Sequence, residues 1–149
     1  MKMPRWVSVV LVAALVFACL ALIRTHVLMI PTLRVALAQR DAADTTFRRY
    51  SDAIRIRDFA TAYSIGSQEF RDALSEADFA AGQQLLEAKW GKLMSSETEA
   101  FSFGGHGDPM EWTAKVRERR HYEHGDVHLL YDFHSNGGRW ELYGYKEVE

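Results

Sequence analysis

The chain has 149 residues, 48% of them hydrophobic, which is enough for one domain with its own core and leaves no room for a second. All 20 acidic residues lie at or beyond Asp41, so the part after Arg40 holds thirteen basic residues against twenty acidic ones, a net charge of −7. That balance argues against a nucleic-acid-binding protein, whose affinity comes largely from neutralising phosphates. Cys19 is the only cysteine, so no intrachain disulfide forms and the core must supply the stability.

The run from Trp6 to Ile23 contains no charged residue and follows Lys2 and Arg5. As a helix it spans about 27 Å, which is close to the hydrocarbon thickness of a bilayer. Three interpretations are open: an uncleaved signal anchor, a cleaved secretory signal peptide, and a lipoprotein signal ending at Cys19. The apolar run continues past Cys19 instead of turning polar, which favours the anchor. We therefore expect residues 1–30 to be a transmembrane anchor held by membrane lipid.

A short stalk is expected over residues 31–41, between the anchor and the domain. Pro31 stops or restarts the helix, and Leu33 and Leu37 after it are typical of a short amphipathic stretch at the membrane surface. The short, charged N-terminus favours a single-pass protein whose domain lies on the extracytoplasmic (periplasmic) side. Basic residues also follow the anchor, and they weaken this orientation signal: Arg24, Arg34 and Arg40.

Three helical segments are expected at the start of the domain, residues 42–149. From Ala42 to Arg57, apolar residues recur every three or four positions and form one buried stripe. Short helical pieces follow between Asp58, a helix N-cap, and Leu74. Ser75 opens the next helix with a side-chain cap, and Gly91 ends it.

Four antiparallel strands are expected after these helices. Their ranges are Ser96 to Phe103, Met110 to Tyr122, and the two arms of a hairpin from Val127 to Lys146. Four-residue loops are expected at residues 123–126 and 135–138, the second with glycine where positive φ is needed. This register places Val116 opposite Phe133, Arg117 opposite Asp132, and Asp132 beside Glu141 on the next strand. A slip of one residue would put arginines in the core.

Helices followed by a four-stranded antiparallel meander, in about 105 residues, resemble the nuclear-transport-factor-2-like superfamily, also called the SnoaL-like or cystatin-like cone. The resemblance covers residues 42–146 and is carried by residues 54–79 (IRIRDFATAYSIGSQEFRDALSEADF) and 137–146 (GGRWELYGYK). It implies an α+β fold with the helices packed on a curved sheet. Members include isomerases, dehydratases and cyclases as well as binding and scaffolding modules, some tethered to a bacterial inner membrane, so the fold does not decide the function.

Two ionisable residues fall on the inward face of the long strand, Glu118 and Arg120. A buried unpaired charge costs several kcal/mol, so we expect them to pair with each other, with Tyr131 or with water in a pocket. In enzymes that look like this, a carboxylate or histidine base works inside the cone. These three residues are therefore candidate catalytic residues of a small enzyme or ligand-binding cone. The alternative is a strand end that leaves the core and exposes both charges.

Histidines surround the loop after the long strand. The expected register sets His121 opposite His128, with His124 or Asp126 as supporting ligands of a divalent metal. The alternative is an exposed polar turn, because no HExxH or paired-cysteine signature is present.

The outward sheet face is the expected interaction surface, for a protein partner or a homodimer. Tyrosine and arginine are enriched at such interfaces, although the same face could be plain solvated surface. Its candidate residues are Arg117, Arg119, Asp132, Arg139, Glu141, Tyr143 and Tyr145. The chain contains no nucleophile elbow, P-loop or dinucleotide fingerprint, and no cofactor is expected. We therefore favour a membrane-anchored interaction or assembly module over an enzyme.

Overall fold

The computed structural model describes residue 16 and residues 32–149, and the chain divides into two compact units, Met1–Ala38 and Gln39–Glu149. In the first unit residue 16 and residues 32–38 are helical, and Leu33, Val35 and Leu37 are exposed. Apart from Val16, the predicted anchor from Trp6 to Ile23 lies outside the described residues. Among residue 16 and residues 32–149, no helix is long and apolar enough to cross a membrane.

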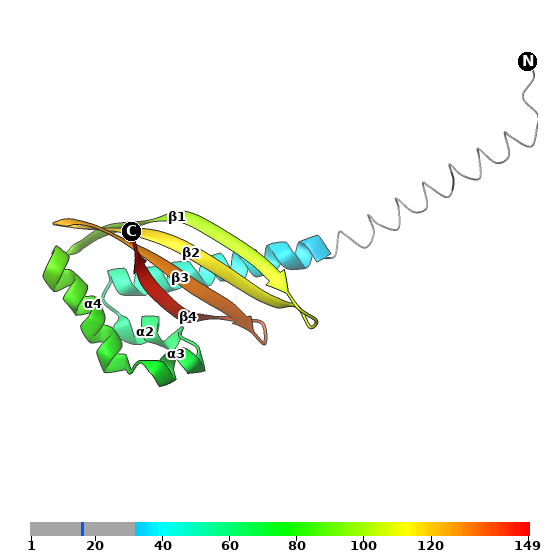
Figure 1. The fold of residues 1–149 in the computed structure, drawn as a ribbon, viewed down its shortest axis with the longest axis horizontal. Helices are drawn as coiled ribbons and strands as arrows, with labels where there is room; N and C mark the ends of the chain where they lie inside the picture. The colour runs from blue at the N-terminus through cyan, green and yellow to red at the C-terminus, as the bar shows by residue number, and fades with distance from the viewer. Residues whose placement is uncertain (1–15, 17–31) are drawn as a thin grey trace, which may run out of the picture. The chain divides into compact units, whose positions relative to one another are not determined.

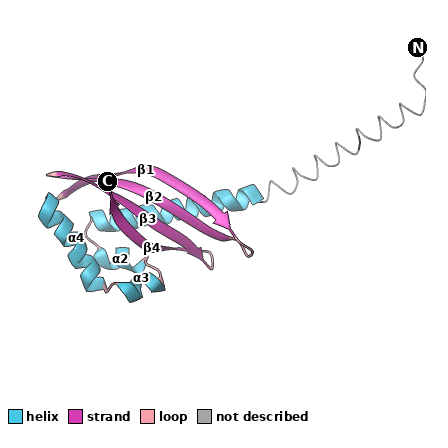
Figure 2. Cartoon of the chain, viewed as in Figure 1, coloured by secondary structure: helices cyan, strands magenta, loops and turns pink. Residues whose placement is uncertain are grey.

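The second unit is an α+β domain in which helices pack on one face of a four-stranded antiparallel sheet (Figure 1). The first helix is the uninterrupted helical stretch of residues 32–55, of which residues 39–55 belong to this unit, and the strands follow one another in the sheet in chain order (Figure 2). The other elements are α2 (Phe59–Ser64), α3 (Gln68–Ala73), α4 (Glu76–Trp90), β1 (Leu93–His106), β2 (Glu111–Tyr122), β3 (Gly125–Asn136) and β4 (Arg139–Val148). The predicted α+β class and the antiparallel meander are confirmed.

Side-chain caps fix the starts of helices α2 and α4. Asp58 accepts a hydrogen bond from the Thr61 amide at 3.0 Å, and Ser75 accepts one from the Asp78 amide at 3.1 Å. These caps satisfy amide groups that a helix start otherwise leaves unpaired. Gly91 ends α4 with a φ of +82°, a conformation that glycine adopts without steric cost. The predicted roles of Asp58, Ser75 and Gly91 are confirmed.

The predicted register of the β2–β3 hairpin is wrong by two residues. Tyr122 pairs with Gly125, so the turn consists of Glu123 and His124 alone. Gly125 permits this because a Cβ there would lie 2.9 Å from the Trp90 ring that packs against it. Val116 is therefore opposite Tyr131 instead of Phe133. A shift of two residues keeps every side chain on its predicted face, because side chains alternate with a period of two.

The β3–β4 hairpin also differs from its prediction. Its turn is the pair Gly137 and Gly138, with φ of +57° and +83°, so the predicted positive φ is confirmed but the loop has two residues instead of four. A bulge follows in β4, since Asp132 pairs with Gly144 whereas Phe133 pairs with Leu142. The extra residue opposite these pairs is Tyr143, and the bulge reverses the facing of the residues after it.

Aromatic side chains fill the space between the helices and the sheet. Phe47 and Tyr50 of the first helix meet Tyr131 and Phe133 of β3, with ring centroids 5.4–6.4 Å apart. Phe79 of α4 joins them and is fully buried. Such tilted and edge-to-face contacts stabilise the core beyond the burial of their area.

Candidate functional site

The two inward charges of β2 lie in a buried hydrogen-bonded cluster. Glu118 and Arg120 each expose only 1% of their surface, and Arg120 Nε donates to Glu118 Oε2 at 3.0 Å. Tyr131 Oη donates to the same oxygen at 2.7 Å and accepts from Arg120 Nη2 at 2.7 Å. The expectation that Glu118 and Arg120 pair with each other and with Tyr131 is confirmed. The alternative in which both charges see solvent is wrong.

Helix α4 supplies the remaining partners of this cluster. Gln83 Oε1 accepts from Arg120 Nη1 at 2.9 Å, and Gln83 Nε2 donates to Tyr145 Oη at 3.1 Å. One buried guanidinium is thus held by a carboxylate, an amide and a phenol. Low dielectric strengthens each of these bonds, and leaving any partner unmatched would be costly. The cluster fixes the distance between α4 and the sheet.

Burial sets the protonation of the cluster. Burial raises the pKa of Tyr131 well above its ordinary value, and it raises the pKa of Tyr50 as well. Burial opposes the charge of Arg120, but the negative charge of the Glu118 carboxylate beside it favours that charge, and the pKa of Arg120 is raised. At neutral pH both tyrosines are therefore neutral and Arg120 is charged.

A second branch of the cluster reaches the surface. Ser51 Oγ donates to Glu118 Oε1 at 2.5 Å, and Ser51 Oγ lies 3.1 Å from Ser96 Oγ of β1. A hollow of about 250 Å³ opens here between the first helix and β1, and Glu118 forms part of its lining. Sequence analysis missed both serines. Ser51 could have been predicted to face the sheet, because it lies one helical turn after Phe47, which is buried.

Side chains fill the interior between the helices and the sheet. Phe47, Tyr50 and Phe79 are buried there, while Trp90 and Trp112 are half-buried at the margins. The predicted catalytic roles of Glu118, Arg120 and Tyr131 remain predictions. The hollow by the first helix gives Glu118 a route to solvent.

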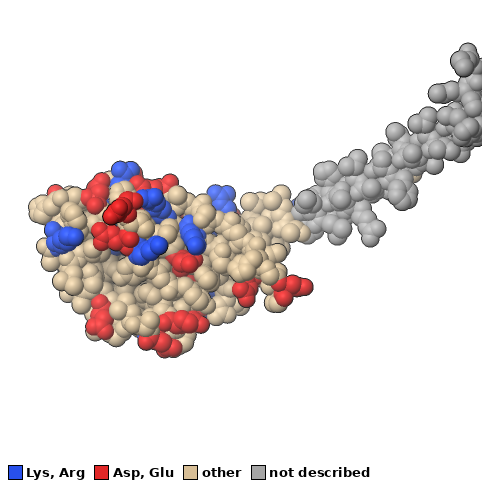
Figure 3. Space-filling model, in the orientation of Figure 1, with Lys and Arg blue, Asp and Glu red and all other residues tan. Residues whose placement is uncertain are grey.

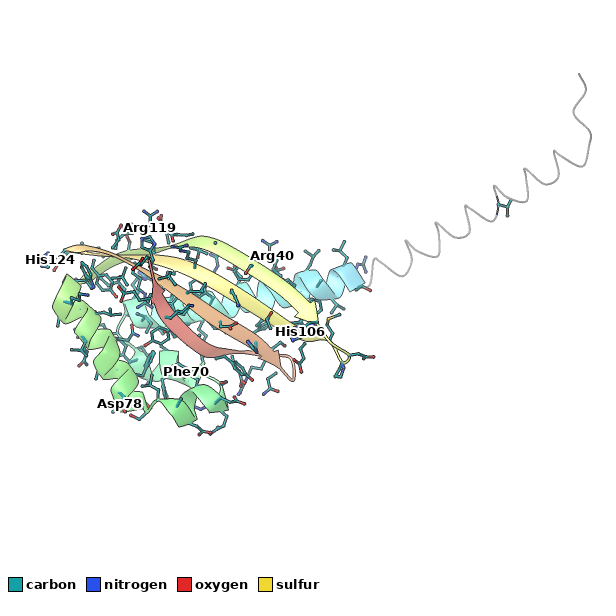
Figure 4. The ribbon with its side chains drawn as sticks, viewed as in Figure 1. Arg40, Phe70, Asp78, His106, Arg119 and His124 are labelled. Atoms are coloured by element: carbon teal, nitrogen blue, oxygen red, sulfur yellow. The ribbon has the colours of Figure 1, made fainter. Side chains whose placement is uncertain are left out.

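Ion pairs cover one end of the outer sheet face. Arg117 lies 3.2 Å from Glu99, and Arg119 pairs with both Glu97 and Glu99. A hydrogen bond from His128 lowers the pKa of Glu99. Arg119 lies at this end of the sheet in Figure 4. The predicted compensation of Asp132 by Arg117 is wrong, because the two-residue register shift places Lys115 opposite Asp132.

The other predicted interface residues divide between the two faces. Tyr143 stacks on His134 with ring centroids 4.1 Å apart. Glu141 is 6% exposed and pairs with Arg139; it lies opposite His134, so its predicted contact with Asp132 is wrong. Tyr145 lies opposite Tyr131 and contacts Phe79 in the core, because the bulge turns it inward. The prediction that Tyr145 belongs to the outer face is wrong.

The histidines do not converge as the predicted register required. His121 is opposite Asp126, with Nδ1 and Oδ1 2.8 Å apart, whereas His128 is opposite Arg119 and bonds Glu99 at 3.0 Å. His124 lies at the turn, at the far end of the sheet from His106 (Figure 4). Within residues 32–149 no group of three or more histidine, cysteine or acidic side chains could hold a metal ion. The predicted facing of His121 and His128 is wrong.

Comparison with known proteins adds a distant likeness. The sequence matches no protein-family model and no curated protein. Among solved structures, it is similar to the solution structure of a SEC-C motif-containing protein from Rhodopseudomonas palustris. The identity is 17%, the TM-score is 0.40, and the match covers 66% of this chain and 72% of that chain.

Proposed function

We propose that this chain is a single-pass membrane-anchored interaction or assembly module of the nuclear-transport-factor-2-like superfamily, with its domain on the extracytoplasmic side. The observation that supports it best is the uncovered sheet face. In the second unit the helices pack on the inner face, and the outer face of all four strands is bare of helices (Figures 1 and 2). A bare sheet face of this kind can dock another protein.

The composition of the outer face favours a second copy of the chain as the occupant. Basic and acidic side chains are interspersed over the strands in Figure 3. A face that carries both signs can be complementary to itself across a two-fold axis. Between the charges lie Leu130 and the stacked pair Tyr143 and His134, and a hollow of about 240 Å³ beside Leu130 and Gly144 could receive a partner's side chain.

The anchor rests on the sequence. The eighteen uncharged residues from Trp6 to Ile23 are enough to span a bilayer as a helix. An anchor would hold the domains of neighbouring molecules in one plane, and this raises their effective concentration for a weak interface. The charged side chains at one end of the outer face already pair with one another, which fits such a weak interface.

The oligomeric state of the full-length chain in detergent tests the docking face. We expect light scattering to show a dimer, and Tyr143→Glu to convert it to a monomer by placing an unpaired charge within the interface. Leu85→Glu is the control, because Leu85 is 70% exposed on α4, away from the outer face. If the chain instead binds a different protein stoichiometrically, and Tyr143→Glu abolishes that binding, the outer face docks that protein and not a second copy of the chain. A monomer that captures no partner would refute the docking face.

Membrane fractionation tests the anchor independently. We expect the full-length chain to stay in the membrane pellet after alkaline carbonate extraction, and protease added from outside the inner membrane to degrade the domain. Release of the chain by carbonate would refute the anchor. Protection of the domain in intact spheroplasts, with cleavage only after lysis, would place it in the cytoplasm instead.

A further inference from the structure

The hollow between the first helix and β1 has a buried carboxylate in its lining. Its volume is about 250 Å³. Glu118 is 1% exposed, yet its side chain borders this space. The hollow lies on the helix side of β2 and so is separate from the outer sheet face. Its lining residues are Phe47, Arg48, Ser51, Asp52, Ser96, Thr98 and Glu118.

The hydrogen-bond chain from Glu118 to the hollow runs in one direction only. A carboxylate accepts and does not donate, so the Ser51 hydroxyl must donate its proton to Glu118 Oε1, 2.5 Å away. The 3.1 Å contact between Ser51 and Ser96 then requires Ser96 to be the donor. The only proton of the Ser96 hydroxyl is then donated to Ser51, so Ser96 Oγ can act toward the hollow only as a hydrogen-bond acceptor.

The groups behind Glu118 hold this arrangement in place. Arg120 and Tyr131 both bond to Oε2, which leaves Oε1 for Ser51. A site whose first contact group is oriented by a second layer of hydrogen bonds is preorganised for its ligand. A buried ion pair contributes little net stability, so stability alone does not account for the presence of Glu118 and Arg120 in the interior.

The lining fits a neutral ligand rich in hydroxyl groups. The two charges at the rim already have partners, since Arg48 pairs with Asp44 at 2.8 Å and Asp52 pairs with Arg55 at 3.1 Å. The other polar groups of the lining are the hydroxyls of Ser51, Ser96 and Thr98 and the carboxylate of Glu118, and the hollow has little apolar surface. A hydroxyl group of a polyol can donate to Ser96 and accept from Thr98, whereas an ammonium group would leave the Thr98 proton unmatched.

We propose that this hollow binds a small neutral polyol, of the size of a monosaccharide or alditol, and that Ser96 Oγ accepts a hydrogen bond from a ligand hydroxyl. A shallow site with few apolar contacts binds weakly, so the dissociation constant is expected to be about millimolar. This function is independent of docking at the outer face.

Amide chemical shifts of the full-length chain test the proposal, in a detergent without a sugar headgroup. We expect glucose or mannitol to shift the amides of Ser51, Ser96 and Thr98, with saturation at about millimolar concentration. Ser96→Ala should weaken binding about three- to tenfold by removing one hydrogen bond, and Ser96→Thr should restore it because the hydroxyl is kept. Ser102→Ala is the matched control, because Ser102 lies on β1 outside the hollow and near the Lys115 carbonyl.

Three results would overturn the proposal. The first is the absence of saturable shifts up to about 100 mM sugar, well above the expected dissociation constant. The second is binding that Ser96→Ala and Ser102→Ala affect equally. The third is stronger binding of methylammonium or inorganic phosphate than of the polyols. Unfolding curves of each variant separate a lost contact from a lost fold.

Discussion

Arg57 has a left-handed backbone conformation just after the first helix, at a position where glycine is the usual residue. Its φ is +62°, and it follows the first helix at the position where the Asp58 amide bonds the Ala53 carbonyl at 2.8 Å and its own amide bonds Ile54. This is a Schellman ending. A side chain in the left-handed region costs about 1–2 kcal/mol, and the pair of Arg57 with Glu87 at 3.3 Å is too exposed to offset it fully.

We therefore expect Arg57→Gly to be more stable than Arg57→Ala by about 1 kcal/mol. Both variants lose the ion pair with Glu87, but only glycine relieves the backbone. Urea unfolding of the two full-length variants measures the difference directly. Equal midpoints, or a more stable alanine variant, would mean that the left-handed conformation costs nothing here.

Two buried tyrosines should respond oppositely to the loss of their hydroxyl groups. The Tyr131 hydroxyl bonds both Glu118 and Arg120, so Tyr131→Phe should lower the free energy of unfolding by about 1–3 kcal/mol. The buried Tyr50 hydroxyl lies near the Arg120 guanidinium but forms no hydrogen bond of ordinary geometry in the described part, so Tyr50→Phe should be neutral or stabilising by up to about 1 kcal/mol. Denaturant unfolding compares them. A larger loss for Tyr50→Phe would contradict the assigned bonds.

At the scale of the element, two glycines should respond oppositely to alanine. Gly82 lies inside α4 with open space around it, so Gly82→Ala should raise the free energy of unfolding by about 1 kcal/mol through helix propensity. Gly125 begins β3 with φ of +153°, and a Cβ would lie 2.9 Å from the Trp90 ring. Gly125→Ala should destabilise by about 1–3 kcal/mol. Thermal unfolding that shifts both variants in the same direction would argue against this packing of Trp90.

The elements divide into those that local signals predict and those that packing decides. Asp58 and Ser75 cap helices through bonds within three residues, and such caps can be predicted from sequence. The lengths of the two hairpin turns could not be predicted in this way. Gly125, for example, belongs to β3 and not to the turn, and it packs against Trp90, which is distant in the sequence. The bulge at Tyr143 could not be predicted either, because the alternation of side chains in the sequence gives no sign of one extra residue in a strand. Without the bulge, Tyr145 was predicted on the wrong face of the sheet.

The candidate site shows the same division. The alternation of β2 was enough to place Glu118 and Arg120 on the inner face, because an even register error preserves facing. Their partners from other elements, Gln83 and Ser51, could not be predicted, since contacts between a helix and a strand depend on how the elements pack. Periodicity thus predicts which side chains turn inward, and only the fold decides which of them meet.

At the scale of the whole molecule, the buried tyrosines should make the domain sensitive to alkali. Burial raises the pKa of both Tyr50 and Tyr131. The folded state therefore keeps two protons that the unfolded chain releases above its tyrosine pKa of about 10. A raised pKa stabilises the fold fully below that value, and the contribution is lost as the pH rises above it. Each tyrosine should lower the free energy of unfolding by up to about 1.4 kcal/mol per pH unit there.

Urea unfolding between pH 9 and pH 11 measures this slope, and absorbance of tyrosinate shows how many tyrosines have ionised. We expect Tyr50 and Tyr131 to lower stability by up to about 2.7 kcal/mol per unit above pH 10, and Tyr131→Phe to remove about half of that contribution. Tyr145, whose pKa burial also raises, adds to the slope in both proteins. Tyr50 and Tyr131, which are fully buried, should ionise only as the domain unfolds. Ionisation of all six tyrosines in the folded state would show that solvent reaches the cluster. In that case water and hydroxide reach the interior of the domain, and Glu118 is accessible from within as well as from the hollow.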